Sequence, residues 1–362
     1  MAAPSETRPN MREVARLAKV SIATVSRVLN DHPSASDKAR QAVLDAVDAL
    51  GYRPDAAFSL AFKRQHQGLR GQPIKTRTLA YLTTQFIRDA AMSNDGFYGA
   101  VVSGFNTAIC DAGYHMLWEQ LEPDQTELPA CVREHRVDGV IVDGTADPAL
   151  REQLSRLLPT VFVGRPYNST SSSCVLANYS QAVNAQLEYL WELGHRRVAC
   201  FVPVTSCSYL RDLVRGFEDF HADHGVAPSH PALCTPREIS PETHERVLRD
   251  YVQELLAASD RPTAVLALNV YAIPIQRFLQ EQGVRVPHDI SVIGVNETPS
   301  NTGQYASPPM TSWQMPQEAI GRTAAEMLMQ RIEKKTDVQE CLLLNGHRIE
   351  RASCARAASK SV

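Results

Sequence analysis

Hydrophobic residues near the N-terminus recur every three or four positions, a spacing typical of helices that bury one face. The pattern predicts helices over residues 11–18, 22–29 and 37–50, with a tight connection between the first two. Ser21 stands just before the second helix, where its hydroxyl can accept an amide hydrogen near Thr24 as an N-cap. Two short helices joined in this way form a helix-turn-helix pattern, and the third helix would complete a small bundle.

From residue 78 onward, short apolar runs alternate with helical patterns. Such alternation predicts parallel sheets flanked by helices, and two series of it predict two lobes. Ligands of such folds bind beyond the carboxyl ends of the strands, and with two lobes they bind in the cleft between them. The expected strands are 79–83, 114–118, 137–142, 160–163, 197–202, 263–268 and 290–295, with helices at 97–112, 210–224 and 271–282.

Charge divides the chain at the same place. The net charge of the 362 residues is only −3, but residues 1–77 hold 13 Lys and Arg against 7 Asp and Glu. The N-terminal head is therefore basic and the remainder acidic, which favours a polyanionic partner for the head alone. An ordinary basic domain without such a partner is the alternative.

The second expected helix carries side chains suited to reading a DNA duplex. In a helix-turn-helix, the N-terminal residues of this helix face the base edges in the major groove. Arg27 can donate two hydrogen bonds to guanine, and Ile22 and Ala23 can contact thymine methyl groups. Phosphate contacts are expected from four short polar residues: Ser21, Thr24, Ser26 and Asn30. A purely structural three-helix bundle is the alternative.

Other classes of protein find little support in the sequence. The motifs GxSxG, GxGxxG, HExxH and the phosphate loop are absent, so no enzymatic activity is expected. The eight cysteines are widely spaced without CxxC, and His221 and His224 lack further ligands, so no metal or cofactor is expected. Reduced packing cysteines and a solvated histidine face are expected instead. Without a long apolar run or an export signal, a cytoplasmic, soluble protein with no membrane contact is expected.

Motifs along the chain resemble one known family. The run VARLAKVSIATVSRVLN, with LGYRP further on, resembles the DNA-binding head of the lactose-repressor (LacI/GalR) family, and RVDGVIVDG, LGHRRVACF and VPHDISVIGVNE extend the resemblance over almost the whole chain. The resemblance implies dimeric repressors that read a near-palindromic operator in double-stranded DNA, with Ile22, Ala23 and Arg27 at base-reading positions. The expected fold class is α/β: a three-helix helix-turn-helix head plus a two-lobed periplasmic-binding-protein type I body with parallel sheets.

The resemblance and the patterns together give an expected domain organisation. A head with its hinge is expected at 10–61, a linker at 62–77, an effector-binding and dimerisation body at 78–352, and a frayed tail at 353–362. Lobe one is expected at 78–178 and 312–338, and lobe two at 179–311 and 339–352. Tetrameric relatives carry a leucine-heptad tail that this chain lacks, so a homodimer is expected.

The hinge departs from the family pattern. Relatives place a leucine seven residues after the proline, where it wedges into the minor groove, but here that residue is Ala61. Leu60 or Phe62 is therefore the expected wedge. Asp55 stands where relatives have an asparagine that faces phosphate, and phosphate would repel an acid. A plain tether without groove contact is the alternative.

The effector cleft departs further from the family pattern. Sugar-binding relatives have charged clamps where this chain has Gly164, Leu213 and Asn296, which argues against an ordinary free sugar. An effector that is less polar or differently charged would be gripped by Phe97, Tyr98, Arg211, Asn269, Tyr271 and Asn296. A degenerate cleft that senses no small molecule is the alternative.

These observations predict a sequence-specific DNA-binding transcription regulator, more often a repressor than an activator, that a small metabolite controls. The same regulator without an effector is the first alternative. A solute-binding protein of the same fold is a remote one, because the attached head and the missing export signal oppose it.

Overall fold

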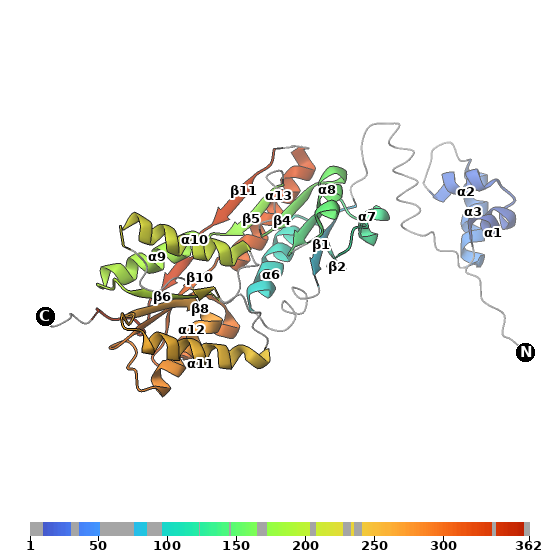
Figure 1. The fold of residues 1–362 in the computed structure, drawn as a ribbon. Coiled ribbons are helices and arrows are strands. Elements are labelled where there is room, and N and C mark those ends of the chain that lie inside the picture. Colours follow the sequence, from blue (N-terminus) through green and yellow to red (C-terminus); the bar gives the residue numbers. More distant parts are fainter. Residues whose placement is uncertain are drawn as a thin grey trace, which may run out of the picture. The chain divides into compact units, whose positions relative to one another are not determined.

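The computed structural model places the chain in two compact units, one comprising Met1–Thr78 and Pro129–Asp138, the other Leu79–Leu128 and Gly139–Val362 (Figure 1). The residues that the structure describes are 10–29, 36–50, 76–84, 96–122, 124–144, 146–164, 172–202, 208–226, 233–234, 241–334 and 338–357.

The first unit begins with three helices at the predicted positions: α1 (Met11–Leu17), α2 (Ile22–Leu29) and α3 (Asp37–Leu50). The Asn10 side chain accepts hydrogen bonds from two amides of the first turn of α1, and the Glu13 side chain accepts one from the Asn10 amide, which forms a capping box. The apolar faces of the three helices meet in one small core: Val14, Ala15, Val25, Val28, Val43 and Ala46. The helical spacing of these residues in the sequence therefore corresponds to a buried face.

The first unit also holds the end of the expected linker. Asp138 accepts hydrogen bonds from the Thr76 amide (2.7 Å), the Thr76 hydroxyl (2.9 Å) and the Arg77 amide (2.8 Å). The carboxylate thus fixes the chain just before the first strand. The same unit contains the short helix α7 (Ala130–Arg133), and linker residues 62–75 lie outside the described residues.

Lobe one of the second unit is built on a six-stranded sheet in the order β11-β5-β4-β3-β1-β2. Its strands are β1 (Thr78–Thr84), β2 (His115–Leu121), β3 (Gly139–Asp143), β4 (Thr160–Val163), β5 (Cys174–Ala177) and β11 (Cys341–Leu344). The pairings of β1, β3, β4, β5 and β11 are parallel. Its helices are α6 (Gly96–Asp111), α8 (Pro148–Leu157) and α13 (Gln317–Lys334).

Lobe two is built on a second six-stranded sheet in the order β12-β10-β9-β8-β6-β7. Its strands are β6 (Val198–Val202), β7 (Leu233–Cys234), β8 (Ala264–Leu268), β9 (Ser291–Glu297), β10 (Thr311–Gln314) and β12 (His347–Ile349), of which β12 is antiparallel to its neighbour. Helices α9 (Tyr179–Glu192) and α10 (Ser208–Asp223) cover one face, and α11 (Pro241–Ala257) and α12 (Asn269–Glu281) cover the other (Figure 1). Short 3-10 turns follow β9 at Pro299–Asn301 (η1) and Gly303–Tyr305 (η2).

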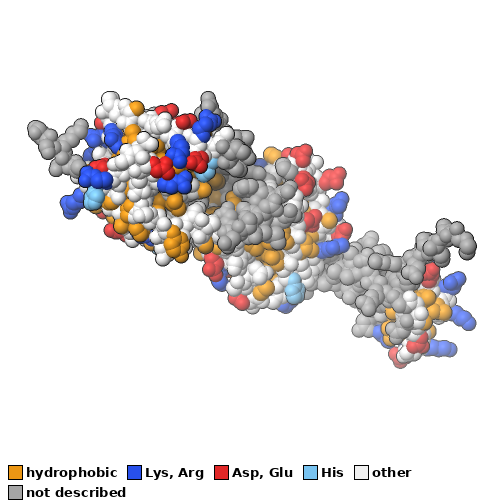
Figure 2. Space-filling view, turned by 90° about the horizontal axis from the view of Figure 1, so that it is seen from below, with side chains coloured by type: hydrophobic (Ala, Val, Ile, Leu, Met, Phe, Trp, Pro, Cys, Tyr) orange, Lys and Arg blue, Asp and Glu red, His pale blue; other side chains and the backbone are white. Residues whose placement is uncertain are grey.

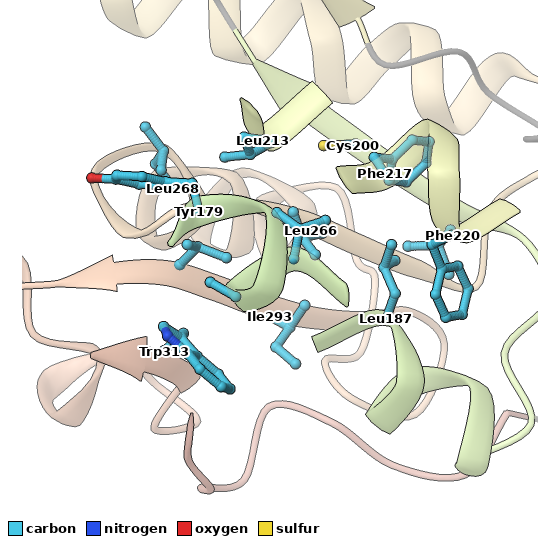
Figure 3. Packing of buried hydrophobic residues seen from close by; sticks show 14 of the residues in the cluster. Tyr179, Leu187, Cys200, Leu213, Phe217, Phe220, Leu266, Leu268, Ile293 and Trp313 are labelled. Atoms are coloured by element: carbon cyan, nitrogen blue, oxygen red, sulfur yellow. The ribbon is translucent and has the colours of Figure 1, made fainter. Parts of the chain in front are cut away.

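The core under α9 and α10 shows why the sheet reads as continuous apolar runs. Leu266 and Ile293 from adjacent strands meet Leu187 of α9 and Phe217 of α10, and all four side chains are almost fully buried (Figure 3). Helices on both faces leave a parallel strand no solvent-facing side, so alternation of polar residues is lost.

The strand pairing differs from the expected lobe boundaries at two places. Residues 312–338 were expected in lobe one and 339–352 in lobe two, but β10 pairs with β9 in the second sheet and β11 pairs with β5 in the first. The chain therefore passes between the sheets after β5, after β10 and again after β11. The physical reason is that a four-residue apolar run fits any buried sheet, and only its hydrogen-bonding partner decides which one it joins.

The tail expected to fray at 353–362 is packed over its first five residues. The Ser353 side chain is buried, and its Oγ accepts a hydrogen bond from the Thr311 amide at 2.9 Å. The Val292 amide donates to the Ser353 carbonyl, and the Ala357 amide donates to the Leu193 carbonyl, both at 2.9 Å. Backbone hydrogen bonds do not depend on side-chain size, so an Ala- and Ser-rich segment can still close against a sheet. Residues 358–362 lie outside the described residues.

Candidate nucleic-acid interface and effector site

The start of α2 has the geometry that the sequence predicted. The Ser21 Oγ accepts a hydrogen bond from the Thr24 amide at 3.1 Å and lies 2.9 Å from the Thr24 hydroxyl. This confirms Ser21 as the N-cap. Lys19, at φ +53°, turns the chain between α1 and α2 in the left-handed region. The cap and the turn together fix the direction in which α2 leaves the bundle.

One face of α2 lies in the core and the opposite face is exposed. Val25 and Val28 are buried, whereas Ala23, Arg27 and Ile22 are exposed, the last with 46% of its surface accessible. Ala23 and Arg27 are one helical turn apart, so they share the exposed face. An exposed branched apolar side chain beside an arginine gives this face both a contact for a methyl group and a pair of hydrogen-bond donors.

The other residues expected to contact phosphate differ in their accessibility. Ser21 is exposed and Thr24 is half-buried, but Ser26 is only 7% exposed. Ser26 faces the bundle because it follows Val25 around the helix, so the expectation of a phosphate contact from Ser26 is not supported by its position. Asn30 and the expected wedge Leu60 lie outside the described residues.

Several more cations surround this face. The exposed basic residues of the three helices include Arg12, Arg16, Lys19 and Lys38. Figure 2 shows Lys and Arg side chains (blue) over the surface of this small helical unit. A helical bundle with spread positive charge attracts a polyanion from any direction.

The second unit holds the residues expected to bind an effector, and Phe97 lies between its lobes. Phe97 and Tyr98 start α6, and their ring centroids are 5.2 Å apart in an edge-to-face arrangement. Phe97 is half-buried and packs against the hydrophobic cores of both lobes. The pair therefore stands where the two lobes meet, as the sequence predicted for a stacking position.

Tyr179 and Tyr209 join this aromatic group, although the sequence analysis did not select them. Their ring centroids are 5.1 Å apart. Burial raises the pKa of Tyr179, and the nearby Tyr209 and Tyr98 hydroxyls raise it further. Tyr98 is thus close to an aromatic pair of lobe two. The available indication was that Tyr179 begins the helix after a strand and Tyr209 begins the helix after the next one.

Asn269 serves the fold more than an open site. Its side chain is fully buried, and its Nδ2 donates hydrogen bonds to the Asn301 carbonyl and the Ser312 hydroxyl, both at 3.0 Å. These bonds tie the start of α12 to η1 and β10. The expectation that Asn269 grips an effector directly is therefore not supported, because its donors are already used and its surface is closed.

The remaining three expected residues do not form one cluster. Asn296 is half-buried at the end of β9, has φ +66°, and its Oδ1 is buried without a hydrogen bond from the described residues. Tyr271 packs its ring against Phe201 and His244 on the α11 side of lobe two. Arg211 is exposed on α10. A left-handed asparagine with an unsatisfied oxygen is the kind of local strain that clusters at functional sites.

A metal site and a membrane span find no support in the described part of the chain. No group of three or more His, Cys, Asp and Glu side chains gathers there, and no described helix is long and apolar enough to cross a bilayer. His221 and His224 do not form the solvated face that was expected. His221 is only 3% exposed, and the Nδ1 atoms of the two rings donate to the carbonyls of Phe217 and Phe220. Neutral imidazole packs well against aromatic rings when its N–H has a partner, and that explains the burial.

A capped helix-turn-helix head on a two-lobed body of parallel sheets defines the class of DNA-binding transcription regulators. Residues 10–55 match the bacterial regulatory proteins of the lacI family, and residues 187–354 match the periplasmic binding protein-like domain. The HTH-type transcriptional repressor PurR of Aliivibrio fischeri (strain MJ11) is 30% identical over 336 residues, which cover 90% of this chain and 92% of that protein. The PurR repressor of Photobacterium profundum is 28% identical and covers 95% and 98%. The chain therefore belongs to the lacI family of bacterial regulatory proteins, and its relatives are transcriptional repressors rather than enzymes.

Solved structures confirm the fold. The lac repressor dimer bound to operator and the anti-inducer ONPF superposes with a TM-score of 0.64 at 22% identity, covering 96% of this chain and all of that one. The complex of the transcriptional regulator CelR with cellobiose gives 0.62 at 24% identity with the same coverage. The expected α/β class, with a helical head and parallel sheets in the body, is thus confirmed.

Proposed function

We propose that this chain is a cytoplasmic repressor that binds a near-palindromic operator as a homodimer and responds to a small metabolite. The single observation that carries the DNA-binding part is the exposed face of α2, where Ile22, Ala23 and Arg27 stand on a helix oriented by the Ser21 cap. A dimer places two such helices on two half-sites and matches its two-fold axis to that of the operator.

Arg27 supplies the base-specific contact in this proposal. Its guanidinium donates two hydrogen bonds to guanine, while Ile22 and Ala23 contact thymine methyl groups beside it. Ser21 and Thr24 contact phosphate through their hydroxyls or amides, and Asn30 and the wedge Leu60 remain proposals from the sequence. Arg12, Arg16 and Lys19 add sequence-independent attraction, so operator binding weakens steeply as salt rises.

The test is selection from randomised duplexes with the full chain. Arg27→Ala is expected to lose the preference for guanine at one position of each half-site, at a cost of about 1–3 kcal/mol in operator affinity. Arg12→Ala is the matched control, because it removes an exposed cation from α1. It is expected to weaken all duplexes equally and to reduce the salt dependence. Identical selected sites for the wild type and Arg27→Ala would reject the proposal.

The effector part rests on Phe97, which packs against both lobes and therefore feels any change in their relative position. Phe97, Tyr98, Tyr179 and Tyr209 offer flat surfaces to a ligand, and Asn296 offers a buried oxygen that lacks a donor. Arg211 and Tyr271 stay in the proposed set only as outer contacts. CelR was solved with cellobiose and the lac repressor with ONPF, which supports a small organic ligand for this chain too.

A thermal-shift screen over sugars, sugar phosphates and nucleosides tests the effector part. A ligand that binds only the folded body raises its unfolding temperature. Tyr98→Phe and Phe97→Ala are expected to weaken the shift, and Tyr305→Ala, at an exposed ring outside the group, is expected to leave it unchanged. A screen without any hit would favour the second candidate, a regulator whose cleft senses no small molecule.

A further inference from the structure

Two cysteines that are far apart in the sequence face each other at an edge of the lobe-one sheet. Cys174 begins β5 and Cys341 begins β11, and the two residues are direct register partners in the parallel pair. Their Sγ atoms are 3.0 Å apart. Cys174 is buried with 4% of its surface accessible, whereas Cys341 is exposed. One sulfur is thus open to a dissolved reagent and the other stands directly behind it.

The backbone around this cysteine pair is held in place. The Cys174 amide donates to the Glu340 carbonyl at 2.9 Å. The Ser173 hydroxyl accepts hydrogen bonds from Arg331 (2.8 Å) and from the Glu340 amide (3.3 Å). A disulfide needs a sulfur–sulfur distance of about 2.05 Å, so the sulfurs must approach by about 1 Å. β11 is the edge strand of its sheet and can make that movement without displacing a second neighbour.

We propose that Cys174 and Cys341 are an oxidation site, at which a hydroperoxide converts the two thiols into an intrachain disulfide. The exposed Cys341 thiolate attacks a peroxide oxygen, the O–O bond breaks, and a sulfenic acid forms as water (or an alcohol) leaves. The Cys174 sulfur then attacks the sulfenic sulfur, the S–O bond breaks, and a second water leaves with the proton of Cys174. The thiols lose two electrons in total and the peroxide gains them.

The position of the pair gives the disulfide a consequence for the whole body. Four residues after Cys174, the Asn178 amide donates to the Leu344 carbonyl at 2.9 Å, and its side chain donates to the Asn345 side chain at 2.9 Å. These contacts join two of the three segments through which the chain passes between the sheets. The disulfide turns this hydrogen-bonded pair of connections into a covalent clamp, which restrains rotation of one lobe against the other.

This site is independent of the operator and of any effector. Reduced thiols are the normal state inside a cell, and disulfides that form there are mostly transient and redox-sensing. The observation concerns the chain alone, so a failure of the DNA-binding proposal would leave it untouched.

The test treats the reduced full chain with a small molar excess of hydrogen peroxide. Free thiols, counted in denaturant, are expected to fall from eight to six, and peptide mapping is expected to find one link that joins residue 174 to residue 341. Dithiothreitol is expected to restore all eight. The oxidised wild type is expected to unfold a few degrees higher than the reduced form, because the link closes a loop of 167 residues.

Three variants make the test specific. Cys341→Ser is expected to abolish the link, and Cys174→Ser is expected to leave a sulfenic acid at Cys341 that dimedone traps. Cys110→Ser, at an exposed cysteine of α6, is the control and is expected to behave as the wild type. A link between two chains, a link to any other cysteine, or sulfinic acid at Cys341 without a link would overturn the proposal. An unchanged unfolding temperature on linkage would overturn the clamp.

Discussion

Arg351 holds Glu297 by two parallel hydrogen bonds, from Nη2 to Oε1 at 2.7 Å and from Nη1 to Oε2 at 2.8 Å. Only 15% and 8% of the two side chains are accessible. Thr302 donates a further bond to the Glu297 carboxylate at 2.8 Å, and Arg351 donates one to the Met310 carbonyl at 2.7 Å. The pair therefore ties the end of β9 to the segment that follows β12, with most donors and acceptors satisfied.

Removal of one partner of this pair is expected to be costly. Arg351→Met leaves the Glu297 carboxylate buried without its cation, and we expect a loss of about 3–5 kcal/mol in the free energy of unfolding. The double variant with Glu297→Gln is expected to recover much of it. Arg156→Met, which breaks an exposed pair with Glu152, is the control and is expected to cost less than about 1 kcal/mol. Urea unfolding of the four proteins decides between these outcomes, and equal costs for the two single variants would contradict the prediction.

Asp143 is expected to make stability fall as pH rises. Burial raises its pKa from 3.8 to about 7, against the hydrogen bond from the Tyr81 hydroxyl at 2.7 Å, which lowers it. The folded state therefore binds a proton that the unfolded chain releases, and this contribution is full below the unfolded pKa and is lost between pH 4 and pH 7. Asp143→Asn removes the titration, so its stability advantage over the wild type is expected to grow by on the order of 2–4 kcal/mol between pH 5 and pH 8.

The matched control for this pH effect is Glu326→Gln, an exposed carboxylate on α13. Its free energy of unfolding is expected to follow the wild type across the same pH range. Chemical unfolding at pH 5, 6, 7 and 8 measures both differences, and a constant offset between Asp143→Asn and the wild type would refute the prediction.

The Ser21 cap is expected to matter for both the stability of the head and its affinity for DNA. Ser21→Ala removes the acceptor of the Thr24 amide and is expected to cost about 1 kcal/mol, whereas Ser21→Thr keeps the hydroxyl and is expected to cost little. Ser36→Ala is a control, because the Ser36 hydroxyl lies 3.4 Å from the Ala39 amide and caps α3 more weakly. Calorimetry of the full chain, followed by operator titration, is the measurement. Equal losses for the two alanine variants would show that the Ser21 cap has no special part.

Close contact between α6 and α13 is expected to make lobe one sensitive to a single methyl group. A Cβ on Gly321 would lie 1.8 Å from the Val101 carbonyl oxygen, and one on Gly104 would lie 2.0 Å from the Glu318 carbonyl oxygen. Gly321→Ala therefore forces the helices apart and is expected to cost about 1–3 kcal/mol. Glu326→Ala on the same helix is exposed and is expected to change the unfolding temperature little. A neutral Gly321→Ala would mean that the helices move apart freely.

Local patterns predicted much of the secondary structure. The helical spacing and the Ser21 cap gave α2 and α3 at their observed bounds, and the apolar run at Thr160–Val163 gave β4. These features depend on neighbours within one or two turns, so the sequence carries them directly. The strands β10 and β11 joined sheets other than those expected, because a short apolar run does not specify its partner.

The candidate site shows the same division. Phe97 and Tyr98 were identified from the sequence, and they stand where the lobes meet. Asn269 was assigned to the ligand, but its amide holds η1 and β10 instead. A polar residue after a strand satisfies either role, and only the groups that surround it in space decide which one.

The sequence by itself determined the helix-turn-helix, its cap, the basic head and the alternation of strands and helices, since each depends on residues close together in the chain. Only the tertiary structure decided which strands share a sheet, that Arg351 pairs with Glu297, and that Cys174 meets Cys341 across 167 residues. Contacts between distant segments arise from strand register and helix packing, and a linear pattern of polar and apolar residues does not encode those distances.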